Sequence, residues 1–261
     1  MAQLPAPQDM RKDDRLYLQS VDRTFRVLEA LAQTSQPPSL RELAQLVGVD
    51  KSAVQRIAHT LQVLGYVARD PASGGLVPGQ QLLDRGFDYL RSNPLLARAQ
   101  PLLTNLRNAT GERVDFSLFA RDTIIYALRM QSKRETFFAT LIGRRIPSFS
   151  SSGGRACLSR LDEAEARAIV MESNRVAATP KTITEPDSVM AKIAEARRDG
   201  YACAREESLL GEIVIGGAVT DAEGRPLGAI HIAGSLSEWS EGGFRRKFAP
   251  LLLETARALS G

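Results

Sequence analysis

One predicted helix carries side chains that could hydrogen-bond to a nucleic acid. Apolar residues at helical spacing, including Val54 and Leu61, define the inner face of a helix over residues 51–64. The opposite face holds no carboxylate, and its members are Lys51, Ser52, Gln55, Arg56 and His59. Arg and Gln can form paired hydrogen bonds with base edges in the DNA major groove, whereas Ser and Lys suit phosphate oxygens. The pattern therefore predicts major-groove recognition, with an ordinary solvated helix face as the alternative.

The segments before this helix predict a helix-turn-helix. Ser39 and Glu42 form a capping box that starts a helix, and Gly48 stands where a left-handed residue ends it. Asp50 can cap the next helix. Two short helices joined by a Gly-containing turn are typical of this motif. An earlier helix is expected to start at Ser20, with an inner face formed by Val21, Phe25, Leu28 and Leu31.

A short hairpin is expected after the helix-turn-helix. Residues 65–77 predict a strand, a glycine-rich turn and a second strand, which together form a wing. Arg69 on this wing is a candidate phosphate contact, although a hairpin that only covers the core is equally consistent. The expected organisation is a disordered polar arm at 1–18, a winged helix-turn-helix at 19–78, a connecting helix at 79–93 ended by Asn93-Pro94, and a larger domain at 94–261.

Composition limits the class of protein more than it identifies it. The net charge is +4, and the first 80 residues carry nine Lys and Arg against eight Asp and Glu, so bulk charge does not demonstrate DNA binding. Residues 131–160 are the basic segment, with six Lys and Arg against one Glu. There is no long apolar run and no signal-like start, so we expect a cytoplasmic protein without membrane contact. Cys157 and Cys203 are expected to be free thiols.

An enzyme is not expected. The motifs of serine hydrolases, P-loop proteins and zinc proteases are absent, and the chain has only two histidines, His59 and His231. That leaves little material for a catalytic triad or a multi-histidine metal site, so we expect neither a metal nor a cofactor. The competing function is a protein-interaction or small-molecule sensor module that does not itself bind DNA.

The larger domain is expected to mix helices with antiparallel strands. Alternating or β-branched apolar runs predict strands at 113–119, 123–130, 212–220 and 228–233, and helical spacing predicts helices at 162–173, 185–200 and 244–259. The Ser/Gly stretch 151–154 precedes a short helix, and hydroxyls with backbone N–H groups there suit an anion. An ordinary helix start is the alternative. His231, alone in an apolar strand, is either a core residue or a ligand contact.

Several stretches, taken in order along the chain, resemble the IclR family of transcriptional regulators. They are 20–31, 40–44, 51–56, 61–70, 143–158, 200–211 with its Glu206-Glu207 pair, and 218–234 with its Asp221-to-Gly224 turn. The resemblance implies an α+β protein, in which a winged helix-turn-helix is joined by a helix to a GAF-like effector-binding domain with an antiparallel sheet. It also implies binding to palindromic operator DNA by homodimers, often paired into tetramers, with repression as the expected mode. Asp50 and Ala53 depart from the Pro and Thr common in the family.

The polar helix face, the wing, the Ser/Gly stretch and the resemblance together give the candidate site residues. For DNA, the residues of the recognition helix and the wing are Lys51, Ser52, Ala53, Gln55, Arg56, His59 and Arg69. For the effector, the expected pocket residues are Ser152, Gly153, Gly154, Ala204, Glu212, Val214, His231 and Ala233. The basic segment and His231 favour a small organic acid, and a hydroxy acid ranks first because Glu212 would repel a plain anion.

Overall fold

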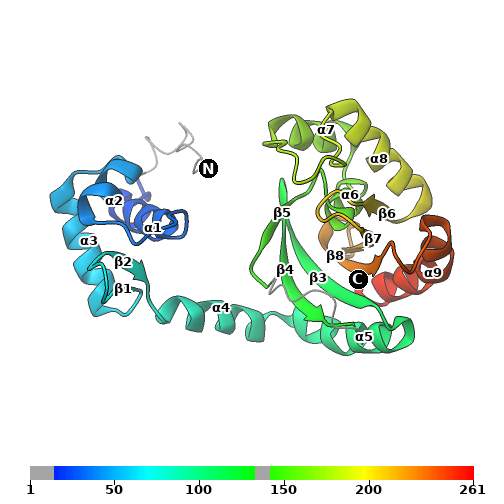
Figure 1. Ribbon diagram of the computed structural model, residues 1–261, viewed down its shortest axis with the longest axis horizontal. Coiled ribbons are helices and arrows are strands. Elements are labelled where there is room, and N and C mark those ends of the chain that lie inside the picture. Colours follow the sequence, from blue (N-terminus) through cyan, green and yellow to red (C-terminus); the bar gives the residue numbers. More distant parts are fainter. Residues whose placement is uncertain (1–14, 133–141) are drawn as a thin grey trace. The chain divides into compact units, whose positions relative to one another are not determined.

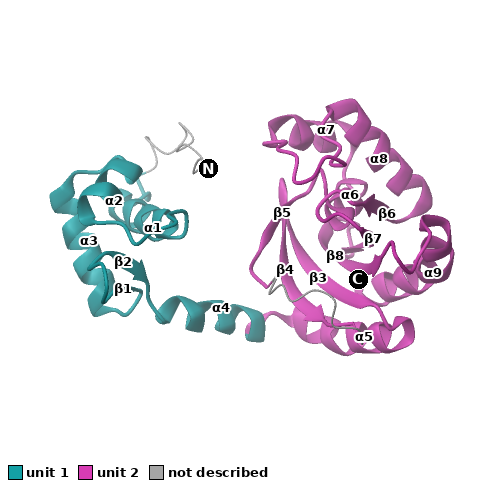
Figure 2. Ribbon diagram, viewed as in Figure 1, with its two compact units in different colours: residues 1–91 teal, residues 92–261 magenta. Residues whose placement is uncertain are grey.

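The computed structural model describes residues 15–132 and 142–261 of the chain. It contains two compact units, residues 1–91 and residues 92–261 (Figure 2), each with its own hydrophobic core. The predicted arm at 1–18 falls mostly outside the described residues, and so does part of the basic segment 131–160.

The first unit contains three helices, a two-stranded hairpin and a further helix (Figure 1). Their bounds are α1 (Gln19–Leu31), α2 (Leu40–Val47), α3 (Lys51–Val63), β1 (Val67–Arg69), β2 (Leu76–Pro78) and α4 (Gln81–Ser92). The capping box at the start of α2 is formed, because Ser39 Oγ accepts the Glu42 N–H at 3.3 Å and Glu42 Oε2 accepts the Ser39 N–H at 2.7 Å. Helix α2 ends at Gly48, whose φ of 65° lies in the left-handed region that favours glycine.

Helix α1 differs from its prediction in two ways. It begins at Gln19 after an extended Leu18, so the expected N-cap at Ser20 is wrong. The expected inner face is also wrong in its first half, because Val21 and Phe25 are 47% and 58% exposed. The buried residues of α1 lie in its second half, where they join the core with α2 and α3: Val27, Ala30 and Leu31. In so small a domain, the packed helices cover only part of α1.

The second unit is built on one antiparallel six-stranded sheet. The sheet order is β5-β4-β3-β8-β7-β6. The strands are β3 (Arg113–Ala120), β4 (Thr123–Met130), β5 (Arg145–Pro147), β6 (Ala202–Arg205), β7 (Glu212–Thr220) and β8 (Pro226–Ser235). The helices are α5 (Pro94–Thr110), α6 (Ser152–Leu158), α7 (Glu163–Glu172), α8 (Pro186–Asp199) and α9 (Glu241–Leu259). The predicted α+β fold class, with its winged helix-turn-helix and antiparallel sheet domain, is confirmed.

The two faces of this sheet are covered by different helices (Figure 1). A Cβ placed on Gly216 of β7 would meet Gly153 of α6, whereas one on the next residue, Gly217, would meet Leu252 of α9. Because side chains alternate across a strand, α6 lies on one face of the sheet and α9 on the other. Within residues 15–132 and 142–261, no helix has both the length and the apolar character needed to cross a membrane.

Candidate nucleic-acid interface and ligand pocket

The polar face of α3 is open to solvent. Lys51, Gln55, Arg56 and His59 are exposed, while the core side of the helix is buried at Val54, Ala58 and Leu61. The structure therefore brings the predicted donor side chains together on one surface. Ala53 lies at the border and is partly buried.

Ser52 is engaged within the start of α3. Asp50 Oδ1 accepts the Ala53 N–H at 2.9 Å and the Ser52 O–H at 2.7 Å. These hydrogen bonds, the one from Ser52 first, hold the pKa of Asp50 below its ordinary value. A hydroxyl has a single hydrogen to donate, so Ser52 must release Asp50 before it can donate to a phosphate.

The wing is attached to the loop between α1 and α2. The Leu76 N–H donates to the Pro38 carbonyl at 2.9 Å, and a Cβ on Gly75 would lie 2.3 Å from the Pro37 oxygen, so this close approach requires glycine. Arg69 is exposed, and its Nη1 donates to the Gly74 carbonyl at 2.8 Å.

An open groove lies between the wing and the starts of α2 and α3. Three of its lining residues are cations, namely Arg41, Lys51 and Arg69. Its one carboxylate, Glu42, is held by the capping box. The sequence predictions included Lys51 and Arg69 but missed Arg41. The place of Arg41 inside the capping box could have identified it. In the first turn of a helix, its long side chain lies beside backbone N–H groups that have no partner within the helix.

Strand register places several predicted pocket residues in one row. Ala204 of β6 pairs with Val214 of β7, which pairs with Ala233 of β8, which pairs with Arg113 of β3. Residues directly opposite each other in a sheet lie on the same face. The next row on that face contains Gly216 opposite His231, and α6 covers it.

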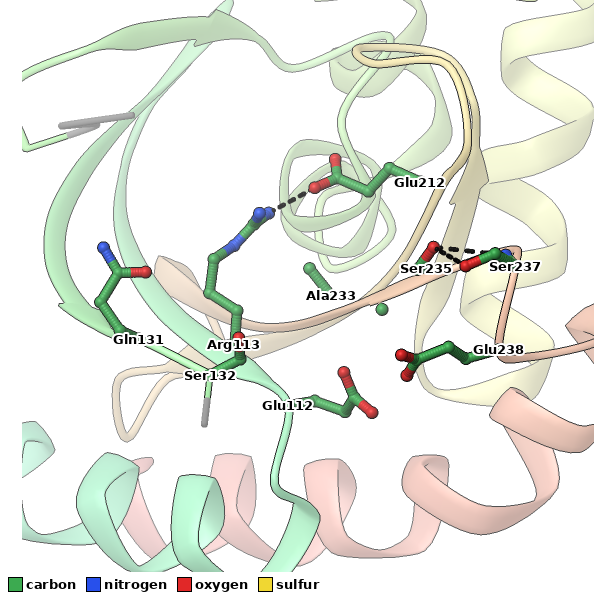
Figure 3. Close-up of a pocket in the computed structure, with 10 residues that line it drawn as sticks. Glu112, Arg113, Gln131, Ser132, Glu212, Ala233, Ser235, Ser237 and Glu238 are labelled. Atoms are coloured by element: carbon green, nitrogen blue, oxygen red, sulfur yellow. Dashed lines mark hydrogen bonds and ion pairs between the residues drawn. The ribbon is translucent and has the colours of Figure 1, made fainter. Parts of the chain in front are cut away.

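Two cavities open along this face. The smaller, about 30 Å³, brings together four predicted residues, Ser152, Ala204, Glu212 and Val214. Ser151, from the Ser/Gly stretch predicted to suit an anion, lines it too, and the wall also includes residues that the sequence predictions did not name as pocket residues: Tyr126 and residues 206–209. The larger, about 80 Å³, contains the predicted Ala233 together with Arg113, and Glu212 lines both cavities (Figure 3).

Three predicted pocket residues lie behind the cavity wall. A Cβ on Gly153 would be 2.2 Å from His231 Cε1, and one on Gly154 would be 2.3 Å from Ser148 Cα. These two glycines therefore let α6 sit against its neighbours. His231 is 1% exposed, with Nε2 2.8 Å from Ser117 Oγ and Nδ1 3.5 Å from Ser152 Oγ.

His231 is neutral in this environment. Burial lowers its pKa from 6.5 to about 4, and the attraction of Asp115 offsets only part of that effect. The neutral ring lies between the hydroxyls of Ser117 and Ser152. It is not placed to offer a protonated imidazole to a ligand.

Among the described residues that line the two cavities, the one cation is Arg113. Arg113 Nη2 is 2.8 Å from Glu212 Oε1, and its Nε is 3.0 Å from Asp115 Oδ2. Arg129 Nε holds the other Asp115 oxygen at 2.8 Å. The sequence predictions missed Arg113 and Asp115 as pocket groups, although their two-residue spacing in a strand puts both on one face.

A buried ion pair fixes the loop that closes the smaller cavity. Arg155 Nη1 and Nη2 lie 2.6 and 2.7 Å from the two oxygens of Glu207, and both side chains are buried. The Ile183 N–H also donates to Glu207 Oε2 at 3.0 Å. Arg155 belongs to the basic segment and lies within α6, and its charge is neutralised by Glu207. Positions 206 and 207 stood out in the sequence only as a Glu pair.

A winged helix-turn-helix with an exposed, donor-rich α3, followed by a separate sheet domain, defines a DNA-binding transcriptional regulator. The family sequence profile for the bacterial transcriptional regulator IclR C-terminal domain matches residues 87–261, and that for the IclR helix-turn-helix domain matches residues 20–71. The chain belongs to the IclR family of transcriptional regulators, which are not enzymes.

Curated relatives and solved structures agree with this assignment. The transcriptional repressor IclR of Escherichia coli is 28% identical over 84% of this chain and 81% of its own length. An IclR-type regulator from Alicyclobacillus acidocaldarius is 25% identical, covering 94% of this chain and 98% of its own, with a TM-score of 0.79. An IclR homolog from Microbacterium hydrocarbonoxydans, solved in complex with 4-hydroxybenzoate, is 18% identical with a TM-score of 0.73, covering 92% of this chain and 97% of its own, and shows the shared fold.

Proposed function

We propose that this regulator is a repressor that binds operator DNA as a homodimer and is controlled by a small organic acid. The observation that carries the DNA-binding half is the exposed polar face of α3. The proposed DNA contacts are Lys51, Ser52, Ala53, Gln55, Arg56, His59 and Arg69, and Arg41 joins them from the groove. An operator-binding protein works beside the chromosome, so the proposed location is the cytoplasm.

Substitution of Arg56 tests whether α3 contacts the operator. Because its guanidinium is exposed in the middle of the polar face, Arg56→Ala should weaken specific operator binding by about 1–3 kcal/mol and relax discrimination at one base pair. Operator affinity is measured by gel shift at two salt concentrations. Arg167→Ala is the matched control, since Arg167 is an exposed cation on α7 of the sheet domain, paired with Asp187. Equal affinity for Arg56→Ala and wild type would remove Arg56 from the contact set.

The effector is proposed to bind along the row that joins the two cavities. The proposed set is Ser152, Gly153, Gly154, Ala204, Glu212, Val214, His231 and Ala233, with His231 acting through Ser152 and the glycines through the seating of α6. Hydroxyl donors, a nearby guanidinium and short apolar side chains suit a small hydroxy acid. The 4-hydroxybenzoate held by the homolog from Microbacterium hydrocarbonoxydans is an acid of that kind.

Operator release tests the effector class. The operator complex is titrated with 4-hydroxybenzoate and with a panel of aliphatic hydroxy acids, using the matching amides as neutral controls. An acid that releases the operator should also raise the melting temperature of the protein, because it binds only the folded state. Release by amides and acids alike would contradict an acid effector.

The homodimer is proposed to form through α4 and the first half of α1. Helix α4 has no buried residue, and Leu83 and Phe87 are 76% and 60% exposed at helical spacing. A second copy of the chain would cover this apolar stripe and place two recognition helices on a palindrome. Phe87→Asp should convert a dimer, or a dimer of dimers, into smaller species in sedimentation equilibrium. A wild-type monomer at micromolar concentration would refute the proposal.

A further inference from the structure

One ion pair stands where the two cavities of the sheet domain meet. Glu212 lines both cavities, and its partner Arg113 reaches toward it across the larger one (Figure 3). The smaller cavity, about 30 Å³, has room for about two water molecules. The larger cavity is about 80 Å³, so a ligand that occupies both cavities must open the partition between them.

The two carboxylates that contact Arg113, those of Asp115 and Glu212, differ in the number of contacts that hold them. Asp115 is 1% exposed and is bound by Arg113 Nε at 3.0 Å and by Arg129 Nε and Nη2 at 2.8 and 3.4 Å. Glu212 is 12% exposed, and within the described part of the chain its one ion pair is to Arg113 Nη2 at 2.8 Å. Glu212 also begins β7 directly after the loop, whereas Asp115 lies within β3. Glu212 is therefore the carboxylate that can move away from Arg113.

Charge balance determines what happens when an anion enters. Among the residues that the structure describes, Arg113, Arg129, Asp115 and Glu212 pair two cations with two anions, all at most 13% exposed. A further carboxylate added to this set would leave an uncompensated negative charge in a poorly hydrated site, which is costly. An incoming carboxylate that replaces Glu212 keeps the network neutral.

We propose that Arg113 is the carboxylate receptor of the effector site, and that the ligand binds by taking the place of Glu212 on the Arg113 guanidinium. This rests on the proposed control by an organic acid and adds the residue that recognises it. Asp115 keeps Arg113 Nε fixed, so the terminal nitrogen is presented in a set direction. Glu212 turns away and the two cavities join. The preferred ligand is a monocarboxylate with a short body and a distal hydroxyl that can reach Ser152 and Tyr126 in the smaller cavity.

Chemical rescue tests this receptor without knowledge of the natural effector. Glu212→Ala removes the resident carboxylate and leaves Arg113 with an empty position. The melting temperature of the full chain is measured in sodium acetate and in sodium chloride at equal ionic strength. Acetate present at several times its dissociation constant should raise the melting temperature of Glu212→Ala by about 2–4 °C above the chloride value. The wild type should respond less, because Glu212 competes for the same nitrogen.

Two double variants test whether the acetate response depends on Arg113. Arg113→Gln/Glu212→Ala should lose the acetate response, whereas Arg129→Gln/Glu212→Ala should keep it, since Arg129 contacts Asp115 but not Glu212. If either double variant fails to fold, Glu212→Ser replaces Glu212→Ala, because serine also removes the carboxylate and leaves the position beside Arg113 open. An acetate response that survives loss of Arg113, or no difference between acetate and chloride in Glu212→Ala, would overturn the receptor assignment.

The acetate experiment and the operator-release experiment can fail independently of each other. Rescue is measured without DNA, so it reports on Arg113 alone. Rescue of Glu212→Ala in a protein whose operator binding no acid changes would support the receptor and refute acid control. Operator release by an acid in a protein whose Glu212→Ala variant shows no rescue would support acid control and refute exchange at Arg113.

Discussion

The buried imidazole of His231 makes the stability of the sheet domain depend on pH. Its pKa is lowered from 6.5 to about 4, chiefly by burial, and Arg113 and Arg129 act in the same direction. The unfolded chain therefore takes up a proton near pH 6.5, whereas the folded chain takes it up only near pH 4. The contribution of His231 to the free energy of unfolding is therefore fully present above pH 6.5 and is lost as the pH falls toward 4. At about 1.4 kcal/mol for each pKa unit, the loss from this group is about 3 kcal/mol.

The assay is urea unfolding of the full chain at several pH values between 7 and 4. Carboxylates titrate over part of this range, so the comparison is with His231→Gln, which cannot take up the proton. The difference in unfolding free energy between wild type and His231→Gln should shrink by about 3 kcal/mol from pH 7 to pH 4. His59→Gln, a change on the exposed face of α3, should follow the wild type. A difference that does not change with pH would show that His231 is not held neutral by burial.

Further predictions concern packing and charge. Gly153→Ala should destabilise by about 1–3 kcal/mol because its Cβ would meet the His231 ring at 2.2 Å, whereas Gly242→Ala, which meets only the mobile end of an Arg at 3.2 Å, should change little in the same thermal unfolding experiment. Glu207→Ala should cost about 3–5 kcal/mol by leaving Arg155 buried without its partner. Asp187→Asn, which breaks an exposed ion pair, should cost less than about 1 kcal/mol. Similar losses for Glu207→Ala and Asp187→Asn would refute the role given to burial.

Much of the fold follows from short-range signals. The capping box at Ser39, the left-handed Gly48 and the cap at Asp50 each act within a few residues, so the bounds of α2 and α3 were predictable. The exposed face of α3 was predictable for the same reason, because helical spacing decides which side chains share a face. Local alternation likewise predicted β3 and β4, and an apolar, β-branched run bounded by glycine predicted β7.

The first helix shows where such signals fail. Val21 and Phe25 have the spacing of an inner face, yet they are exposed while Val27 and Ala30 are buried. Spacing identifies residues that share a face, but only the neighbouring helices decide which face of the helix is covered. The same limit applies to α4, whose apolar stripe is left exposed by the part of the chain that the structure describes.

The sequence by itself determined the class of protein, the exposed polar face of α3 and five of the residues that line the smaller cavity. Only the tertiary structure decided the roles of the others. His231 was placed beside Ser117, a residue 114 positions away, and Arg113 was placed between Asp115 and Glu212. Such roles depend on strand register and on helix α6 lying against β7 and β8, which bring together residues from distant parts of the chain. Burial and charge neutralisation are properties of that assembled environment, so no local pattern could reveal that the histidine is neutral or that the arginine faces the cavity.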